Sequence, residues 1–152
     1  MEEYEAFGEA YAATVVKHAL LFAQTLQRQG LVVLSAQRSF TESHQVLAKV
    51  NSNAEAAWNG LTAAGILANL IRLPREDAPG LRFGLAETAR LGYTASEIEE
   101  LGLLVANLVN GRSDAQTAKT SVKDLSLRPR SMKFCFEENP GTPVNAPRKA
   151  IA

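Results

Sequence analysis

Arg82 is the residue whose setting most clearly suggests chemistry, because glycines flank it within a short, mainly apolar run. It lies between Gly80 and Gly84 in the segment Pro79-Gly-Leu-Arg-Phe-Gly. A guanidinium group is planar and permanently charged, and its parallel N–H groups can hold both oxygens of a carboxylate. Glycines on either side allow a ligand or a second backbone to approach closely. Arg82 is therefore a candidate carboxylate-binding residue. The alternative is an ordinary arginine at a strand edge that pairs with Glu87 or with solvent.

The other reactive side chains suggest less. A polar stretch, Arg38 to His44, precedes a predicted strand. His18 falls within the first predicted helix with no acid or nucleophile beside it in sequence, so we expect a packed or surface imidazole. Cys135 lies in an apolar run that we interpret as a strand, where a buried, inert thiol is expected. Two histidines and one cysteine are too few for a zinc or iron site.

The composition is that of one ordinary globular domain, with 152 residues of which 46% are hydrophobic and 21% charged. Sixteen basic residues balance sixteen acidic ones, so nothing draws the chain to nucleic acid or to an anionic membrane. The acidic start, Met1 to Glu5, is unlike a signal peptide. The longest mainly apolar stretch, Leu101 to Val109, is too short for a membrane span. We therefore expect a cytoplasmic domain without nucleic-acid or membrane partners.

Hydrophobic periodicity predicts the elements that would position Arg82. Apolar residues at steps of three and four, from Tyr4 to Leu26, predict a long helix that ends at Gly30. Further helices are predicted over 53–65, 94–110 and 114–125. Strands are predicted over 31–35, 45–50, 66–73, 81–84 and 132–136. Strands that follow one another without a helix between them favour an α+β fold, with helices packed on one face of a small, largely antiparallel sheet.

We assign residues 1–138 to this one domain. From Asn139 onward, prolines, glycine and polar residues dominate, and Ile151 is the only large aliphatic side chain beyond valine. Such a segment cannot bury enough apolar surface to offset the entropy of ordering it. Residues 139–152 are therefore predicted to form a disordered tail.

Short motifs follow one another along most of the chain, from Phe7-Gly-Glu-Ala-Tyr11 through Ser43-His-Gln-Val-Leu47 to Gly80-Leu-Arg-Phe-Gly84 and Thr88-Ala-Arg-Leu-Gly92. Their order and spacing together resemble the small, C-terminal domain of serine hydroxymethyltransferases. This family, with related threonine aldolases and transaldolases, belongs to the fold-type I pyridoxal-phosphate enzymes.

The resemblance implies a role for each matching residue. Arg82 corresponds to the arginine that binds the α-carboxylate of a small amino-acid substrate, with Gly80 and Gly84 beside it. Arg90 corresponds to an arginine that we expect to support this strand. His44 corresponds to a histidine that we expect to be part of the scaffold.

The resemblance also implies what lies outside this chain. In the family, the lysine that binds pyridoxal phosphate and the other cofactor contacts lie in a large domain that precedes the small one. None of the lysines here sits in a matching motif, so the cofactor would come with a large domain or subunit, in a homo- or hetero-oligomer. Because carbanion chemistry depends on the cofactor, we expect the chain alone to be inactive. The alternative is a non-catalytic binding or interaction module that kept the fold.

Three positions depart from the family pattern, namely Ile71, Leu85 and Ala89. Ile71 replaces an asparagine implicated in folate contact, and the other two replace threonines. These departures make the use of tetrahydrofolate doubtful and favour a folate-independent aldolase or transaldolase relative.

Overall fold

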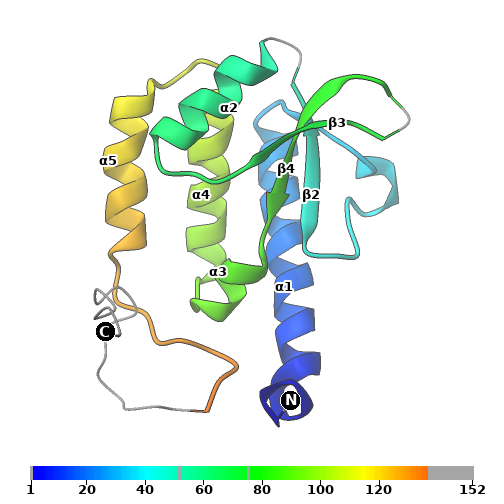
Figure 1. The fold of residues 1–152 in the computed structure, drawn as a ribbon, viewed down its shortest axis with the longest axis vertical. Coiled ribbons are helices and arrows are strands. Elements are labelled where there is room, and N and C mark those ends of the chain that lie inside the picture. Colours follow the sequence, from blue (N-terminus) through cyan, green and yellow to red (C-terminus); the bar gives the residue numbers. More distant parts are fainter. Residues whose placement is uncertain (1, 51–52, 75, 137–152) are drawn as a thin grey trace, which may run out of the picture.

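In the computed structural model, helices pack against a four-stranded antiparallel sheet (Figure 1). The structure describes residues 2–50, 53–74 and 76–136. The predicted α+β fold is therefore confirmed. The predicted tail, 139–152, lies outside the described residues. No helix in the described ranges is long and apolar enough to cross a membrane.

The sheet consists of β1 (Val32–Val33), β2 (Gln45–Lys49), β3 (Asn69–Arg72) and β4 (Pro79–Gly84). Its order is β1-β2-β4-β3, so that β4 lies between β2 and β3, and every neighbouring pair is antiparallel. Successive side chains of a strand point to opposite faces of a sheet. Along β2 and β4, the buried side chains of one face are Val46, Ala48, Leu81 and Phe83.

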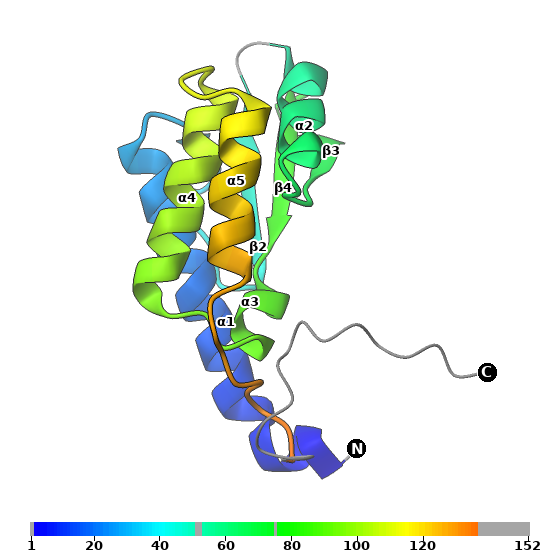
Figure 2. The same cartoon turned by 90° about the vertical axis from the view of Figure 1, so that its left-hand side faces the viewer.

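Five α-helices are seen in the described chain: α1 (Glu2–Arg28), α2 (Ala54–Ala63), α3 (Ala86–Arg90), α4 (Ala95–Val109) and α5 (Ala115–Ser126). The buried face of α1 meets the sheet where the rings of Phe22 and Phe83 lie 5.3 Å apart, edge to face. Helix α4 packs closely on α1, because a Cβ on Gly102 would lie only 2.8 Å from Thr25 Cγ2. Figure 2 shows α4 and α5 running side by side, and α1 extending past them at its N-terminal end.

Local signals account for most helix boundaries. Asn53 caps α2 by accepting a hydrogen bond from the Ala56 N–H, and Asp114 caps α5 in the same way. Thr94 and Glu97 form the predicted capping box of α4. Gly30, just beyond α1, has a φ of 90°, a left-handed conformation that glycine adopts without strain. The helices predicted from these residues are confirmed.

The strand predicted over 132–136 is wrong. This segment runs beside α1 and α3, where the Lys133 N–H donates to the Arg90 carbonyl and the Phe134 ring packs 5.5 Å from that of Tyr11. The rings of Phe134 and Phe136 contact α1 rather than a sheet, so a short apolar run was not evidence of strand pairing. Cys135 accordingly lies outside any strand and is half-buried. The short helix α3 and the 3-10 turn at Ala36–Arg38 were not predicted.

Candidate functional site

Arg82 lies on an inner strand of the sheet and on the face opposite the core. Its neighbours in β4, Leu81 and Phe83, are 0% and 3% exposed, so they fill the core, and Arg82 between them points the other way. The register sets Arg82 directly opposite Leu47 of β2 and Asn69 of β3. The side chains of such cross-strand neighbours are in reach of one another.

Asn69 is the residue that contacts the charged end of Arg82. Its Oδ1 accepts a hydrogen bond from Arg82 Nη2 at 2.9 Å and a longer one from Nε at 3.3 Å. No carboxylate in the described ranges forms an ion pair with Arg82, so Glu87 is not its partner there. The guanidinium is therefore held by a neutral group and keeps its full charge on the open face of the sheet.

The two glycines that flank Arg82 have different surroundings. A Cβ on Gly80 would lie 2.5 Å from Leu73 Cδ2 and 2.8 Å from the Ala48 carbonyl oxygen, so close packing excludes a side chain there. A Cβ on Gly84 would meet no atom within 4 Å. The space beside Gly80 is filled by the domain itself, and only Gly84 leaves room for an incoming group.

The two residues expected to support the site lie away from the guanidinium of Arg82. The His44 side chain is exposed next to Gln45, while its carbonyl accepts a hydrogen bond from the Leu85 N–H at 2.9 Å, just beyond the paired ends of β2 and β4. Arg90, in α3, donates to the Phe134 carbonyl and to Glu3 Oε2, the latter at 2.9 Å. Arg90 thus ties the start of α1 to the segment after α5.

Two surface hollows of about 500 and 480 Å³ lie elsewhere. The first is lined by residues such as Gly30, Lys49 and Asn110, and the second by residues such as Leu70 and Asp77. Arg82 lines neither of them. A ligand held by Arg82 would therefore sit on an open surface in this chain.

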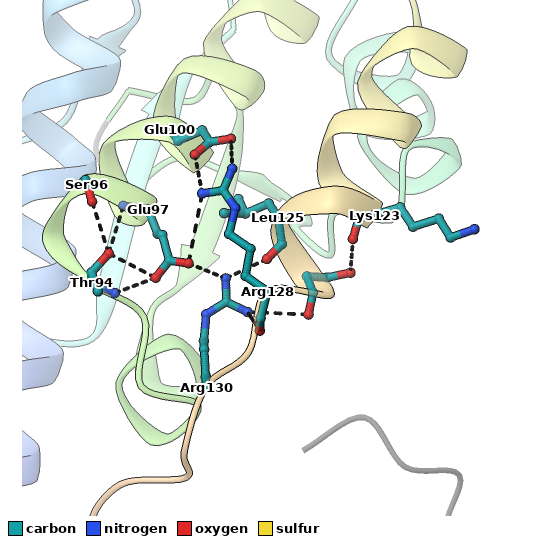
Figure 3. Close-up of polar contacts among 9 residues, drawn as sticks. Thr94, Ser96, Glu97, Glu100, Lys123, Leu125, Arg128 and Arg130 are labelled. Atoms are coloured by element: carbon teal, nitrogen blue, oxygen red, sulfur yellow. Dashed lines mark hydrogen bonds and ion pairs between the residues drawn. The ribbon is translucent and has the colours of Figure 1, made fainter. Parts of the chain in front are cut away.

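Sequence reasoning missed a charged cluster where the segment after α5 meets the start of α4 (Figure 3). Arg130 Nη2 donates to Glu97 Oε1 at 2.6 Å, and these two side chains are only 7% and 10% exposed. The Arg130 guanidinium also lies 3.9 Å from the centre of the Tyr93 ring. Nearby, Arg128 holds both carboxylate oxygens of Glu100, at 2.6 and 2.7 Å. The cluster joins two segments of the chain and pairs every carboxylate in it, which indicates a structural role.

The electrostatics of Glu97 follow from these contacts. Burial alone would raise the pKa of its carboxyl group. Hydrogen bonds from Arg130 and Thr94, together with the positive charge of Arg130, outweigh that effect and lower the pKa below its usual value of 4.5. Glu97 was predicted as part of a capping box, but its partner Arg130 is 33 residues away and has no local signal.

The His18 side chain, which belongs to α1, is buried against α3. Of the two expected outcomes, a packed or a surface imidazole, the packed one is observed. Its Nδ1 lies 3.0 Å from Thr88 Oγ1, and the Thr88 hydroxyl donates to the Leu85 carbonyl at 2.7 Å. The hydroxyl has one proton, so His18 Nδ1–H is the donor in their contact. Burial, with a smaller contribution from Lys17, lowers the pKa of His18 below its usual 6.5. His18 is thus a packed imidazole, and its burial favours the neutral form.

A lysine is the side chain through which pyridoxal phosphate is bound as a Schiff base. Of the lysines in the described ranges none is buried, and Lys49 pairs with Glu76 at 3.0 Å. Nor do these ranges contain a cluster of histidine, cysteine and carboxylate side chains that could hold a metal ion.

Comparison with known proteins gives a consistent answer. No protein-family model matches the chain. A serine hydroxymethyltransferase from Korarchaeum cryptofilum is 35% identical to it over 148 residues, which are 91% of this chain. The enzyme of the same name from Methanopyrus kandleri is 34% identical over 93% of the chain. The chain is homologous to part of serine hydroxymethyltransferase.

The match is partial in one direction, because the chain spans only 34% and 35% of the length of these two relatives. A crystal structure of L-threonine transaldolase from Pseudomonas fluorescens, in its internal aldimine state, matches 82% of this chain with a TM-score of 0.75 and 27% identity. The chain spans 29% of that protein. The resemblance inferred from the motifs is therefore confirmed in both sequence and fold.

The three positions that depart from the serine hydroxymethyltransferase pattern lie in different parts of the structure. Leu85 and Ala89 are 2% and 1% exposed and belong to the core, so they do not line the Arg82 face. Ile71 is two residues beyond Asn69 on β3 and shares the face of Arg82. Of the three positions, Ile71 is therefore the one whose side chain could meet a group bound beside Arg82.

Proposed function

We propose that this chain binds the carboxylate of a small amino-acid substrate through Arg82, as one part of an enzyme related to serine hydroxymethyltransferase. The observation that carries the proposal is the Arg82 guanidinium itself. It lies on the open face of the sheet, it has no carboxylate partner in the described chain, and the neutral side chain of Asn69 holds it in place. A fixed, unneutralised guanidinium is suited to the capture of a carboxylate from solution.

The contribution of Arg82 to a reaction would be one of position. Two parallel hydrogen bonds to a carboxylate fix the direction of the bond to Cα and thereby orient the bonds that will break. In this family, pyridoxal phosphate supplies the electron sink when it is bound. Because the described lysines are not buried, we assign the contacts of the cofactor to the two thirds of the relatives' length that this chain does not span. The chain alone would then bind a carboxylate without turning it over.

Apolar residues on the open face of the sheet support the proposal that a second part of the enzyme covers this face. Antiparallel sheets that face water carry polar residues on that face. Here, however, Leu47 lies directly opposite Arg82, and Ile71 lies in the next row of the same face. Val32, on the edge strand β1, is 47% exposed. A protein surface placed over these residues would bury apolar area and remove water from the guanidinium, which strengthens its interaction with a carboxylate.

The test is whether the chain, reconstituted with the large domain or subunit that the proposal requires, distinguishes glycine from glycinamide, which lacks the carboxylate. A hydrogen bond to a charged group contributes about 1.5–3 kcal/mol, so glycine should bind roughly 10- to 150-fold more tightly. Arg82→Gln should abolish most of this preference. The matched control is Arg72→Gln, on the neighbouring strand β3, where the exposed arginine pairs with Asp77; it should keep the preference.

Retention of the preference in Arg82→Gln would refute the proposal. It would favour the alternative in which the fold serves as an interaction module and Arg82 takes no part in substrate binding.

A further inference from the structure

The contact between Asn69 and Arg82 has a geometry that bears on how a ligand can approach. A guanidinium presents two edges with parallel N–H groups: a side edge made by Nε and Nη2, and an end edge made by Nη1 and Nη2. Asn69 Oδ1 accepts from Nε at 3.3 Å and from Nη2 at 2.9 Å, so it occupies the side edge. Because a guanidinium only donates, the amide must present its oxygen there.

We propose that Asn69 is a positioning residue, which turns Arg82 so that a carboxylate binds end-on through Nη1 and Nη2. The inference rests on the proposed function, since it states how that same site takes its ligand. Across the ranges that the structure describes, no group accepts a hydrogen bond from Arg82 Nη1. The end edge is therefore the one available to a carboxylate.

The arrangement of the strands explains why the guanidinium turns toward β3. Asn69 on β3 and Leu47 on β2 both lie directly opposite Arg82. Leu47 has no acceptor in its side chain, whereas Asn69 offers an amide oxygen. The side chain of Arg82 thus has one polar neighbour in the row, and that neighbour fixes its rotamer.

The choice of an amide also matters electrostatically. An aspartate at this position would hold the side edge equally well, but its negative charge would neutralise the guanidinium and repel a carboxylate. Asparagine orients the group and leaves its positive charge for the ligand. The effect on affinity should be that of a neutral hydrogen bond, so Asn69→Ala should weaken carboxylate binding by about 3- to 10-fold.

The experiment uses the full chain, labelled with ¹⁵N, and follows the Arg82 Nε and Nη resonances while acetate replaces chloride at constant ionic strength. In the wild type, acetate should shift the Nη resonances saturably and leave Nε nearly unchanged. In Asn69→Ala, binding should weaken and Nε should shift as well, because the side edge is open. Asn69→Asp should lose the acetate shift. Asn59→Ala, at an exposed position in α2, is the matched control and should behave as the wild type.

The outcomes separate this inference from the proposed function. A wild-type shift at Nε as large as that at Nη, or an Asn69→Ala variant with unchanged affinity and shift pattern, would overturn the positioning role while carboxylate binding stands. Absence of a saturable acetate shift at Arg82 would overturn the carboxylate site itself, and the end-on geometry with it. Thermal unfolding of each variant should match the wild type, because Asn69 is exposed.

Discussion

The packing around Gly80 allows a quantitative test of the surroundings of the two glycines that flank Arg82. In Gly80→Ala the new Cβ would lie 2.5 Å from Leu73 Cδ2, 2.6 Å from Leu73 Cγ and 2.8 Å from the carbonyl oxygen of Ala48. Leu73 is only 3% exposed, and the carbonyl belongs to the neighbouring strand, so neither can move away freely. Overpacking of this kind costs about 1–3 kcal/mol. For a domain of this size, that lowers the midpoint of thermal unfolding by about 2–12 °C.

Gly84→Ala is the matched control at the other end of the same strand. Nothing lies within 4 Å of its added methyl group, so its free energy of unfolding should stay within about 0.5 kcal/mol of the wild type. Urea and thermal unfolding of the two variants, followed by circular dichroism, provide the comparison. Equal stability of Gly80→Ala and the wild type, or equal losses in both variants, would refute the assignment of Gly80 to close packing and of Gly84 to open space.

Two further predictions concern buried titratable side chains. Because the folded-state pKa of Glu97 is lowered, its contribution to stability is present at neutral pH and should be lost as the pH falls below about 4.5. Removing one partner of a buried pair typically costs about 3–5 kcal/mol, so Glu97→Ala should approach that loss of stability at pH 7. Its free energy of unfolding should also fall less steeply than that of the wild type as the pH drops below about 4.5. An unchanged pH dependence in this range would contradict the pairing with Arg130. The folded-state pKa of His18 is also lowered, so protonation favours the unfolded chain and stability should decline as the pH falls below about 6.5. His18→Gln should remove that decline, and its persistence in the variant would show that another group is responsible.

Local signals made much of the fold predictable. The capping box of Thr94 and Glu97 and the left-handed glycine after α1 are readable because their partners are within a few residues. Helix α3 was not predicted because it has only five residues, and because its N-cap residue, Leu85, provides no side-chain cap. The false strand at 132–136 shows the limit of a short apolar run as a strand signal, because a segment whose rings pack against a helix has one as well.

The candidate site was likewise predictable only where local sequence signals determine it. The position of Arg82 between two core residues of a strand was accessible from alternation and its glycine neighbours. Its contact with Asn69 was not, because 13 residues separate the two and only the register of β3 on β4 brings them together. The ion pair of Arg130 and Glu97 likewise depends on how the segment after α5 returns to α4.

The central claim is that Arg82 holds a carboxylate through two parallel hydrogen bonds from its guanidinium. The most direct test is the amino-acid Kd of the Arg82→Lys chain, reconstituted with the large domain or subunit that the proposed function requires. Lysine keeps the charge but cannot form two parallel hydrogen bonds. We expect binding to weaken by about 1.5–3 kcal/mol, while the free energy of unfolding of the chain hardly changes. An unchanged Kd together with a strongly destabilised chain would contradict the claim and show that Arg82 is structural.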